Sequence, residues 1–371
     1  MIYVLQVMDN IAVHSGVSSV VLNIYRNIDR KQIQFDFLVS NRTADSYEKE
    51  ILQYEGRIVY LGNPLSVKTL ISACKNSRRF FEENSERYTA VHLHSPTIAE
   101  MTIRYGARYG IKNIIIHSHS SMFSNILIKK AINKILTARL DSFATHYWYC
   151  SDEAGKFLFG DDFKSKPNSQ WIRNGIDVES KRFDERKRME VRKKYGVDDC
   201  KIACHISNFS AAKNTGFLAD IIDQVTSRDS SWCFLFVGDG PWRKMLERQI
   251  DSAGLSSYCI FTGISDQVSL FLNAADVLLL PSIKEGLPVV AIEAQACGLP
   301  CLLSNTITRQ VDVYGVQYLP LKHEEWIKAL CGFHVSTDQE RMAASVDFSD
   351  SKFNIQKEVR RIETLYKNMV K

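Results

Sequence analysis

Short apolar runs alternate with longer amphipathic stretches along almost the whole chain. Five runs of strand character begin near residues 3, 35, 90, 113 and 146, and five more begin near residues 201, 233, 258, 276 and 300. Uninterrupted apolar runs of this length are typical of strands buried on both faces, and the helical stretches between them suit parallel crossover connections. The pattern therefore predicts an α/β fold in which helices cover parallel sheets.

A polar, charge-dense segment at residues 179–194 separates the two series of strands. The sequence IRNGID at residues 172–177 ends the first series with Asn-Gly turn chemistry, so we place a domain boundary near residue 178. The predicted domains are residues 1–177 and 178–349. Residues 182–194 are basic with interspersed acids and predict a solvated helix. Residues 350–371 predict an amphipathic helix whose apolar side holds Phe353, Val359, Ile362 and Leu365.

Composition narrows the class of protein. The 371 residues, 45% of them hydrophobic and 24% charged, suit two folded domains rather than a disordered chain. The apolar runs are too short to cross a bilayer, and the first residues, MIYVLQVMDN, read as a buried strand rather than a secretory leader. Nine scattered cysteines fit a reduced compartment, so we expect a cytoplasmic protein. The pairs Cys200 with Cys204 and Cys297 with Cys301 lack metal-site spacing, and we expect buried thiols there.

Positive charge is concentrated in one segment. Residues 101–140 hold seven Lys and Arg residues and no acid, against a net charge of +5 for the whole chain. Within this tract, residues 124–140 predict an amphipathic helix. The helix either packs on the first sheet with solvated lysines or docks on anionic lipid. We expect no nucleic-acid partner, because the chain has the charge but no stacking motif or recognition module.

The most specific functional motif of the chain is the segment PSIKEGLPVVAIEAQACGLP at residues 281–300. Gly286 breaks the regular structure after an apolar strand, and Pro288 is favoured in the first turn of the helix that follows. The free N–H groups and the dipole of such a helix start favour an anion such as a diphosphate. Glu285 before the helix and Glu293 within it can accept hydrogen bonds from sugar hydroxyls. The segment predicts a nucleotide-sugar site, although a plain loop and cap with a solvated Glu293 would show the same two carboxylates.

The full string EGLPxxxxEAxAxGLP resembles the donor-binding signature of glycosyltransferase family 4, whose members are retaining enzymes of GT-B fold. The segments at residues 14–24, 172–177, 234–247 and 261–282 resemble other motifs of that family in the same order. Residues 147–160 and 304–330 are most similar to transferases of bacterial exopolysaccharide and capsule assembly. The resemblance implies two Rossmann-like domains whose parallel sheets face an interdomain cleft, with a C-terminal helix that returns to the first domain. It places the acceptor on the first domain and the nucleotide sugar on the second.

The resemblance also implies roles for individual residues. The catalytic candidates are His117, His119, Lys213 and Glu285. Lys213 would meet the donor diphosphate, Glu293 the ribose, and one of the two histidines the donor sugar across the cleft. His92 and His94, after the preceding strand, are weaker candidates. The donor-binding set implied is Ser15, Gly16, Asn208, Lys213, Gly238, Gly263, Glu285, Gly286, Leu287, Pro288 and Glu293.

The chain departs from the family pattern at Ser207 and Asn208, where Gly-Arg is usual. Loss of that arginine removes one charge-assisted contact to the leaving diphosphate. Arg243 or Lys244 could replace it, or the chain could be a weakly catalytic scaffold for another transferase. There is no Asp-x-Asp motif, so we expect metal-independent chemistry in which Lys213 and helix dipoles neutralise the leaving nucleotide.

The function implied by the resemblance is transfer of a sugar, with retention, from a nucleoside-diphosphate sugar to a polyprenyl-diphosphate-linked glycan. The resemblance favours UDP as the nucleotide. Such an acceptor is held in a membrane, so we expect peripheral association with the anionic inner face of the cell membrane. A nucleotide-sugar epimerase is an alternative, but it needs a paired acid and base that the sequence does not reveal.

Overall fold

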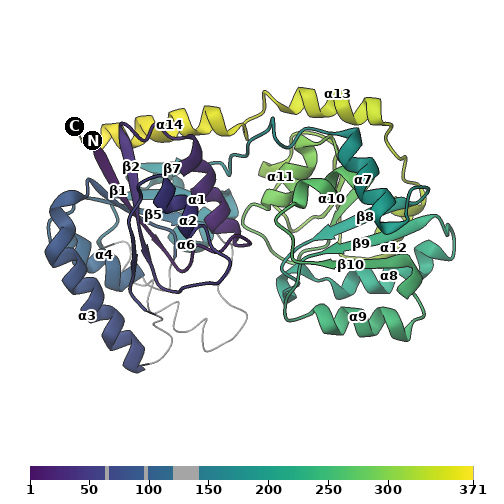
Figure 1. Ribbon diagram of the computed structural model, residues 1–371, viewed down its shortest axis with the longest axis horizontal. Coiled ribbons are helices and arrows are strands. Elements are labelled where there is room, and N and C mark those ends of the chain that lie inside the picture. Colours follow the sequence, from purple (N-terminus) through teal and green to yellow (C-terminus); the bar gives the residue numbers. More distant parts are fainter. Residues whose placement is uncertain (63–66, 96–98, 120–141, 371) are drawn as a thin grey trace. The chain divides into compact units, whose positions relative to one another are not determined.

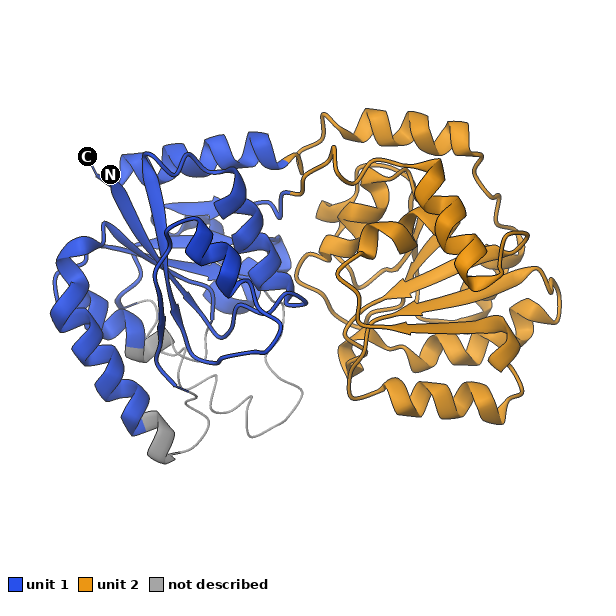
Figure 2. Ribbon diagram, in the orientation of Figure 1, with its two compact units in different colours: residues 1–175, 355–371 blue, residues 176–354 orange. Residues whose placement is uncertain are grey.

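The computed structural model describes residues 1–62, 67–95, 99–119 and 142–370. The chain forms two compact units, one of residues 1–175 and 355–371 and the other of residues 176–354 (Figures 1 and 2). Each unit is built on one parallel sheet, as the apolar pattern predicts. In Figure 1 helices lie on both sides of the second sheet, which explains why its strands carry no polar face.

The first unit holds a seven-stranded sheet in the order β3-β2-β1-β4-β5-β6-β7. Its strands are β1 (Ile2–Met8), β2 (Ile33–Val39), β3 (Ile58–Tyr60), β4 (Ala90–Leu93), β5 (Asn113–Ser118), β6 (His146–Tyr149) and β7 (Ser169–Trp171). Its helices are α1 (Gly16–Asn27), α2 (Glu48–Gln53), α3 (Val67–Asn84), α4 (Ala99–Arg108), α6 (Asp152–Phe159) and α14 (Ile355–Asn368).

The second unit holds a six-stranded sheet in the order β10-β9-β8-β11-β12-β13. Its strands are β8 (Lys201–Ile206), β9 (Trp232–Val237), β10 (Cys259–Gly263), β11 (Val277–Leu280), β12 (Cys301–Ser304) and β13 (Val316–Leu319). Its helices are α7 (Glu185–Tyr195), α8 (Gly216–Thr226), α9 (Arg243–Ser252), α10 (Val268–Ala274), α11 (Val289–Ala296), α12 (His323–Cys331) and α13 (Asp338–Phe348).

All ten runs that the apolar pattern predicts as strands form strands, and the sequence reading missed three others. The missed strands, β3, β7 and β13, lie at sheet edges and have only three or four residues each. An edge strand packs fewer side chains against neighbours, so it needs no continuous apolar run. The central strands are different: every residue of β2 and of β9 is buried.

The C-terminal helix α14 belongs to the first unit and packs beside α1. Its buried face holds Val359 and Ile362, as expected, but Tyr366 rather than Leu365 completes that face. Glu358 is also buried, and its carboxylate pairs with Arg173 and Arg361. The helix is therefore anchored by an apolar face and by one buried carboxylate that neighbouring arginines neutralise.

Helix α7 corrects the expectation of a purely solvated helix at residues 182–194. Arg188 and Arg192, one turn apart, donate to the two carboxylate oxygens of Asp276 at 2.6 and 2.7 Å. The Asp276 side chain is 1% exposed, and it also accepts from the backbone N–H of Ile202. The clamp fixes the chain just before β11. The partner of the two arginines is Asp276, a buried residue far along the chain, so the local charge pattern could not predict these contacts.

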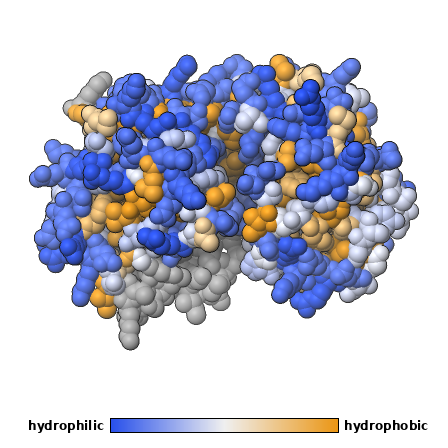
Figure 3. Space-filling model, in the orientation of Figure 1, coloured by the Kyte–Doolittle hydropathy of each residue, from blue (hydrophilic) through white to orange (hydrophobic). Residues whose placement is uncertain are grey.

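The predicted amphipathic helix at residues 124–140 lies outside the described residues, so its packing stays a prediction. None of the described helices is both long enough and apolar enough to span a membrane. The face drawn in Figure 3 is largely hydrophilic, with small apolar groups between the polar side chains.

Arg341 on α13 joins the carboxyl ends of two helices in the second unit. Its guanidinium donates to the carbonyl oxygens of Asn273 and Ala275 at the end of α10, at 2.9 and 2.7 Å. It also donates to the carbonyl oxygen of Cys297, which caps α11, at 3.1 Å. Helix ends leave such carbonyls without partners, so one buried cation satisfies several of them. These bonds hold α11, which carries Glu293.

We expect Arg341→Met to lower the free energy of unfolding by about 3 kcal/mol, because it leaves several buried carbonyl groups without donors. Urea unfolding followed by tryptophan fluorescence measures this change. The control is Arg248→Met on exposed α9 surface, which we expect to change stability by less than about 0.5 kcal/mol. A loss below about 1 kcal/mol for Arg341→Met would contradict the role of this residue.

Candidate functional site

The loops that follow β8 and β11 meet at the carboxyl edge of the second sheet. Lys213 ends a short 3-10 turn, Ala211–Lys213, and helix α8 begins only at Gly216. Lys213 therefore lies in the loop that precedes the helix. The backbone N–H of Ile283 donates to the carbonyl oxygen of Ala212 at 2.8 Å. This bond ties the loop of Lys213 to the loop of Glu285.

Lys213 and Glu285 form an ion pair across these two loops. Lys213 Nζ lies 2.5 Å from Glu285 Oε1, and the Ser282 hydroxyl donates to the same oxygen at 2.8 Å. The side chains are 19% and 11% exposed. The structure therefore brings together two residues that the sequence predicts for donor binding, in a partly buried setting where charge interactions are stronger than in bulk water.

Helix α11 starts directly after this ion pair. Pro288 is its N-cap, with φ −69° and ψ 107°, so it lies one residue before the helix rather than in its first turn as expected. The N-cap residue, a proline, makes no side-chain hydrogen bond to the first turn of α11, and the first turn contains no acid. Its N–H groups and the helix dipole favour an anion beside Gly286 and Leu287.

Glu293, within α11, is neither solvated nor unpaired. Its Oε1 atom lies 2.9 Å from Lys181 Nζ, and the two side chains are 16% and 25% exposed. The sequence reading did not single out Lys181, since nothing in its local sequence marks it. The pairing gives the Glu293 carboxylate a charged hydrogen-bond partner.

The glycine turn after β9 packs against the backbone of the loop after β8. Gly238 has φ +122°, and a Cβ atom there would lie 1.9 Å from the carbonyl oxygen of Ser207. Gly240 is similar, with 2.0 Å to the carbonyl oxygen of Asn208. Gly263, at φ +77°, accepts a hydrogen bond from the Gly238 N–H at 2.8 Å. Only glycine permits this approach, so the turn is a requirement of packing.

The positions where the family usually has Gly-Arg are organised by a buried histidine. His205 Nε2 lies 2.8 Å from the Ser207 hydroxyl oxygen, which accepts from the backbone N–H of Phe209 at 3.2 Å. Asn208 is exposed. Arg243 pairs with Glu247 at 2.7 Å, and its Nη1 atom lies 3.6 Å from the position of a Cβ at Gly263. A cation is thus present beside the glycine turn.

In the first unit, Ser15 and Gly16 start helix α1 after the first strand. The Ser15 hydroxyl caps the helix by accepting from the N–H of Ser18, and Gly16 is its first residue. No described atom lies within 4 Å of a Cβ built at Gly16. The helix start is therefore capped and sterically open.

Four histidines gather at the carboxyl ends of β4 and β5. His92 Nε2 lies 3.2 Å from His117 Nδ1, and His94 Nδ1 lies 2.8 Å from His119 Nε2. His92 Nδ1 also contacts the Tyr366 hydroxyl at 2.7 Å. Residues two apart on a strand share a face, and the ring centroids of His117 and His119 lie 3.9 Å apart with their planes tilted by 35°.

His117 and His119 differ in their exposure to solvent. His117 lies within β5 and is 2% exposed, whereas His119 follows the strand and is partly exposed. Burial lowers the pKa of His117 well below its usual range and that of His119 to about 3, so both are neutral near pH 7. Of the two predicted residues, His119 is the one that solvent reaches.

Three of these imidazoles, those of His92, His94 and His117, offer nitrogen atoms that lie within 4.8 Å of one another. Such a set could hold a metal ion. Hydrogen bonds already use both ring nitrogens of His92 and of His94, whereas His117 Nε2 is buried without a hydrogen-bond partner among the described residues.

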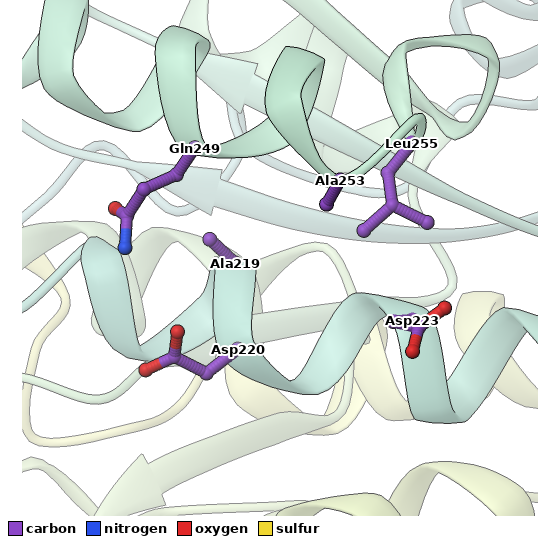
Figure 4. Close-up of a pocket in the computed structure, with 6 residues that line it drawn as sticks. All are labelled: Ala219, Asp220, Asp223, Gln249, Ala253 and Leu255. Atoms are coloured by element: carbon purple, nitrogen blue, oxygen red, sulfur yellow. The ribbon is translucent and has the colours of Figure 1, made fainter.

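A groove of about 430 Å³ lies elsewhere, between α8 and α9 (Figure 4). Its walls are lined by Ala219, Asp220, Asp223, Gln249, Ala253 and Leu255. None of the residues predicted for donor binding lines it, and it has no convergent set of catalytic groups. We therefore place the candidate site at the strand ends.

Comparison with known proteins identifies the family of the chain. The chain matches the model of Glycosyltransferase Family 4 over residues 14–180 and that of Glycosyl transferases group 1 over residues 187–315. The putative glycosyltransferase EpsF of Bacillus subtilis (strain 168) is 30% identical over 300 residues, which are 80% of this chain and 78% of EpsF. An Escherichia coli protein, UDP-Gal:alpha-D-GlcNAc-diphosphoundecaprenol alpha-1,3-galactosyltransferase, is 26% identical over 328 residues, 82% of this chain and 80% of that protein.

The fold has close counterparts among solved structures. HepE of Anabaena, crystallised with UDP and glucose, matches with a TM-score of 0.81 at 16% identity, over 99% of this chain and 100% of HepE. The prediction of a GT-B fold is confirmed by this similarity. Together with the two family matches and the identity to EpsF over four fifths of the chain, it shows that the chain belongs to glycosyltransferase family 4 and is a glycosyltransferase.

Proposed function

We propose that this enzyme transfers a sugar, with retention of anomeric configuration, from a UDP-sugar to a polyprenyl-diphosphate-linked glycan in exopolysaccharide or capsule assembly. The observation that carries the proposal is the meeting of Lys213, Glu285 and the start of α11 at one strand edge. A cation and a helix N-terminus side by side suit a diphosphate, and the adjacent carboxylate suits a sugar hydroxyl.

Donor binding would exchange one set of contacts for another. In the structure the Lys213 ammonium is held by Glu285. A diphosphate bound at the start of α11 would share that ammonium, which leaves carboxylate lone pairs of Glu285 for the transferred sugar. Glu293, held by Lys181, would accept from the ribose hydroxyls. Catalysis then consists mainly of stabilising the departing diphosphate, with no metal ion required for that charge.

The choice of nucleotide and acceptor rests on similar proteins. The Escherichia coli relative is named for a UDP-galactose donor and an acceptor linked to diphosphoundecaprenol, and HepE was crystallised with UDP. The putative glycosyltransferase EpsF is similar to this chain over most of its length. A lipid-linked acceptor would bring this enzyme to the inner face of the membrane, where the basic tract of residues 101–140 would meet anionic lipid.

A scaffold function is a second candidate, favoured by Ser207 and Asn208 in place of Gly-Arg. Arg243 opposes it, because this cation lies beside Gly263 and the glycine turn. An epimerase is the weaker alternative, because both family models that match the chain are models of glycosyltransferases.

We expect Glu293→Gln to weaken binding of the preferred donor at least tenfold, about 1.4 kcal/mol, since a neutral amide accepts weaker hydrogen bonds from ribose hydroxyls. Isothermal titration with a panel of UDP-, GDP- and dTDP-sugars measures the effect and names the donor. Glu340→Gln on α13 is the control, where the exposed side chain caps a helix. If the wild-type protein binds no member of the panel, the scaffold function is favoured over transfer.

We expect Lys213→Met to lower kcat by about 100-fold or more, because it removes a cation from the leaving diphosphate. The assay follows UDP release with a polyprenyl-diphosphate-linked acceptor and the donor named by titration. The matched control is Lys201→Met, which removes a lysine paired with Asp229 at 2.8 Å, at the opposite end of β8. Equal rates for Lys213→Met and wild type would argue against this role, and UDP-sugar consumption without acceptor would point to an epimerase.

A further inference from the structure

Two of the nine cysteines, Cys200 and Cys233, contact each other in the second unit. Their Sγ atoms lie 3.1 Å apart, and both residues are free thiols. The sulfur atoms of a disulfide lie about 2.05 Å apart, so a movement of about 1 Å separates this contact from a covalent bond. The pair is therefore placed to be oxidised, which a lone cysteine is not.

Strand pairing explains why these two thiols meet. Strands β8 and β9 are neighbours in the second sheet, and Ile202 of β8 is the register partner of Cys233 (Figure 1). Residues two apart along a strand share a face, so Cys200, just before β8, lies on the same face of the sheet as Cys233. Cys259 of β10 is the register partner of Phe234, the residue after Cys233, and therefore lies on the opposite face.

The turn that carries Cys200 is held in place by Arg192, the buried arginine of the α7 clamp. Arg192 Nη1 donates to the carbonyl oxygen of Cys200 at 2.9 Å and to that of Asp198 at 3.1 Å. The backbone N–H of Cys200 donates to the carbonyl oxygen of Val197 at 3.2 Å. The backbone is thus fixed on one side of the contact by this turn and on the other by β9. Two thiols held in this way react with each other more readily than with a second molecule.

The two thiols differ in their exposure to solvent. Cys233 is 9% exposed, and burial raises the pKa of its thiol, so Cys233 by itself reacts slowly with an oxidant. The sequence predicts a buried thiol at Cys200 as well, but Cys200 precedes its strand and is partly exposed. An oxidant from solvent therefore reaches Cys200 first, and Cys233 is the neighbour that can react with the oxidised product.

We propose that Cys200 and Cys233 form a redox-modification site, where a hydroperoxide such as hydrogen peroxide converts the two thiols into a disulfide. In the first step the Cys200 sulfur takes one peroxide oxygen to become a sulfenic acid, the O–O bond breaks and one water leaves. In the second step the Cys233 sulfur attacks the Cys200 sulfur, so the S–S bond forms as the S–O bond breaks. The hydroxide leaves with the Cys233 proton as a second water. The two thiols lose two electrons, which the peroxide accepts.

The disulfide ties the turn before β8 to β9. Both cysteines lie near the amino ends of these strands, whereas Lys213 and Glu285 follow the carboxyl ends of β8 and β11. The crosslink joins positions 33 residues apart, which restricts the unfolded chain more than the folded one. Oxidation therefore stabilises the second unit and leaves the donor site unchanged, and thiol reductants reverse it. The site does not depend on the proposed transferase function.

The first test maps the oxidised thiols of the wild-type protein. The reduced protein is treated with increasing hydrogen peroxide, the remaining thiols are alkylated in denaturant, and the digest is analysed by mass spectrometry without reductant. At the dose that oxidises half of the exposed Cys331 thiol, we expect at least half of Cys200 and Cys233 to be joined in one disulfide within the chain that dithiothreitol reverses. Free Cys200 and Cys233 at that dose would overturn the proposal, as would a disulfide of Cys200 with another cysteine.

The second test separates the roles of the two thiols. We expect Cys233→Ser to stop at the sulfenic acid of Cys200, which dimedone then labels, because no neighbouring thiol remains to react with it. Cys200→Ser, at the partly exposed position, is a second variant in which we expect Cys233 to stay reduced. Cys259→Ser is the matched control on the opposite face of the sheet, where we expect the Cys200–Cys233 disulfide to form as in the wild type. Equal dimedone labelling of Cys200 in the wild type and in Cys233→Ser would overturn the role of Cys233.

The third test measures what the crosslink does to the second unit. We expect the oxidised wild type to unfold at a midpoint temperature about 5 °C higher than the reduced protein. We expect its affinity for the donor named by titration to change by less than about twofold, since the crosslink lies at the far end of β8 from Lys213. An unchanged or lower midpoint would overturn the stabilising effect, and loss of donor binding would overturn the separation from the donor site. If the reduced protein binds no donor, the transferase function fails, whereas the mapped disulfide still supports the redox site.

Discussion

Burial of both faces of each parallel sheet is the constraint on which the rest of this structure depends. Helices cover the strands, so the middle of a strand has room for apolar side chains and only for polar groups that find partners. Charged and catalytic side chains are displaced to the ends of strands, where loops begin. Lys213, Glu285 and His119 all lie at such carboxyl ends. The exceptions inside the sheets, Gln6 and His92 among them, are hydrogen-bonded to one another or to neighbours.

The two carboxylates proposed to bind the donor in the second unit are each paired with a lysine. Glu285 holds Lys213, and Glu293 holds Lys181, each in a partly buried setting. Pairing limits the rotamers of each side chain, which reduces the entropy lost when a ligand binds. A site built in this way exchanges ion pairs with its substrate and does not need to order free side chains. Because each carboxylate is paired with a lysine, two carboxylates can lie beside the position that we assign to a diphosphate.

The departure from the family pattern at Ser207 and Asn208 is integrated into the packing of the loops. Ser207 is held by His205, and the carbonyl groups of both residues are covered closely by Gly238 and Gly240. The loop keeps a defined backbone without the usual arginine. Arg243 brings a cation to the same neighbourhood from the start of α9. The loop of Ser207 and Asn208 is therefore well packed even though the usual arginine is absent.

The sequence by itself determined the α/β class, ten of the strands and the donor-binding string, because apolar runs and turn residues act over short stretches of chain. It missed β3, β7 and β13, since an edge strand of three or four residues carries little pattern. Only the tertiary structure decided which charges and imidazoles meet. Lys213 and Glu285 are 72 positions apart, Gln6 and His94 are 88 apart, and His92 and Tyr366 are 274 apart. Contacts over such separations depend on strand order and on where α14 packs, and neither can be predicted from local sequence.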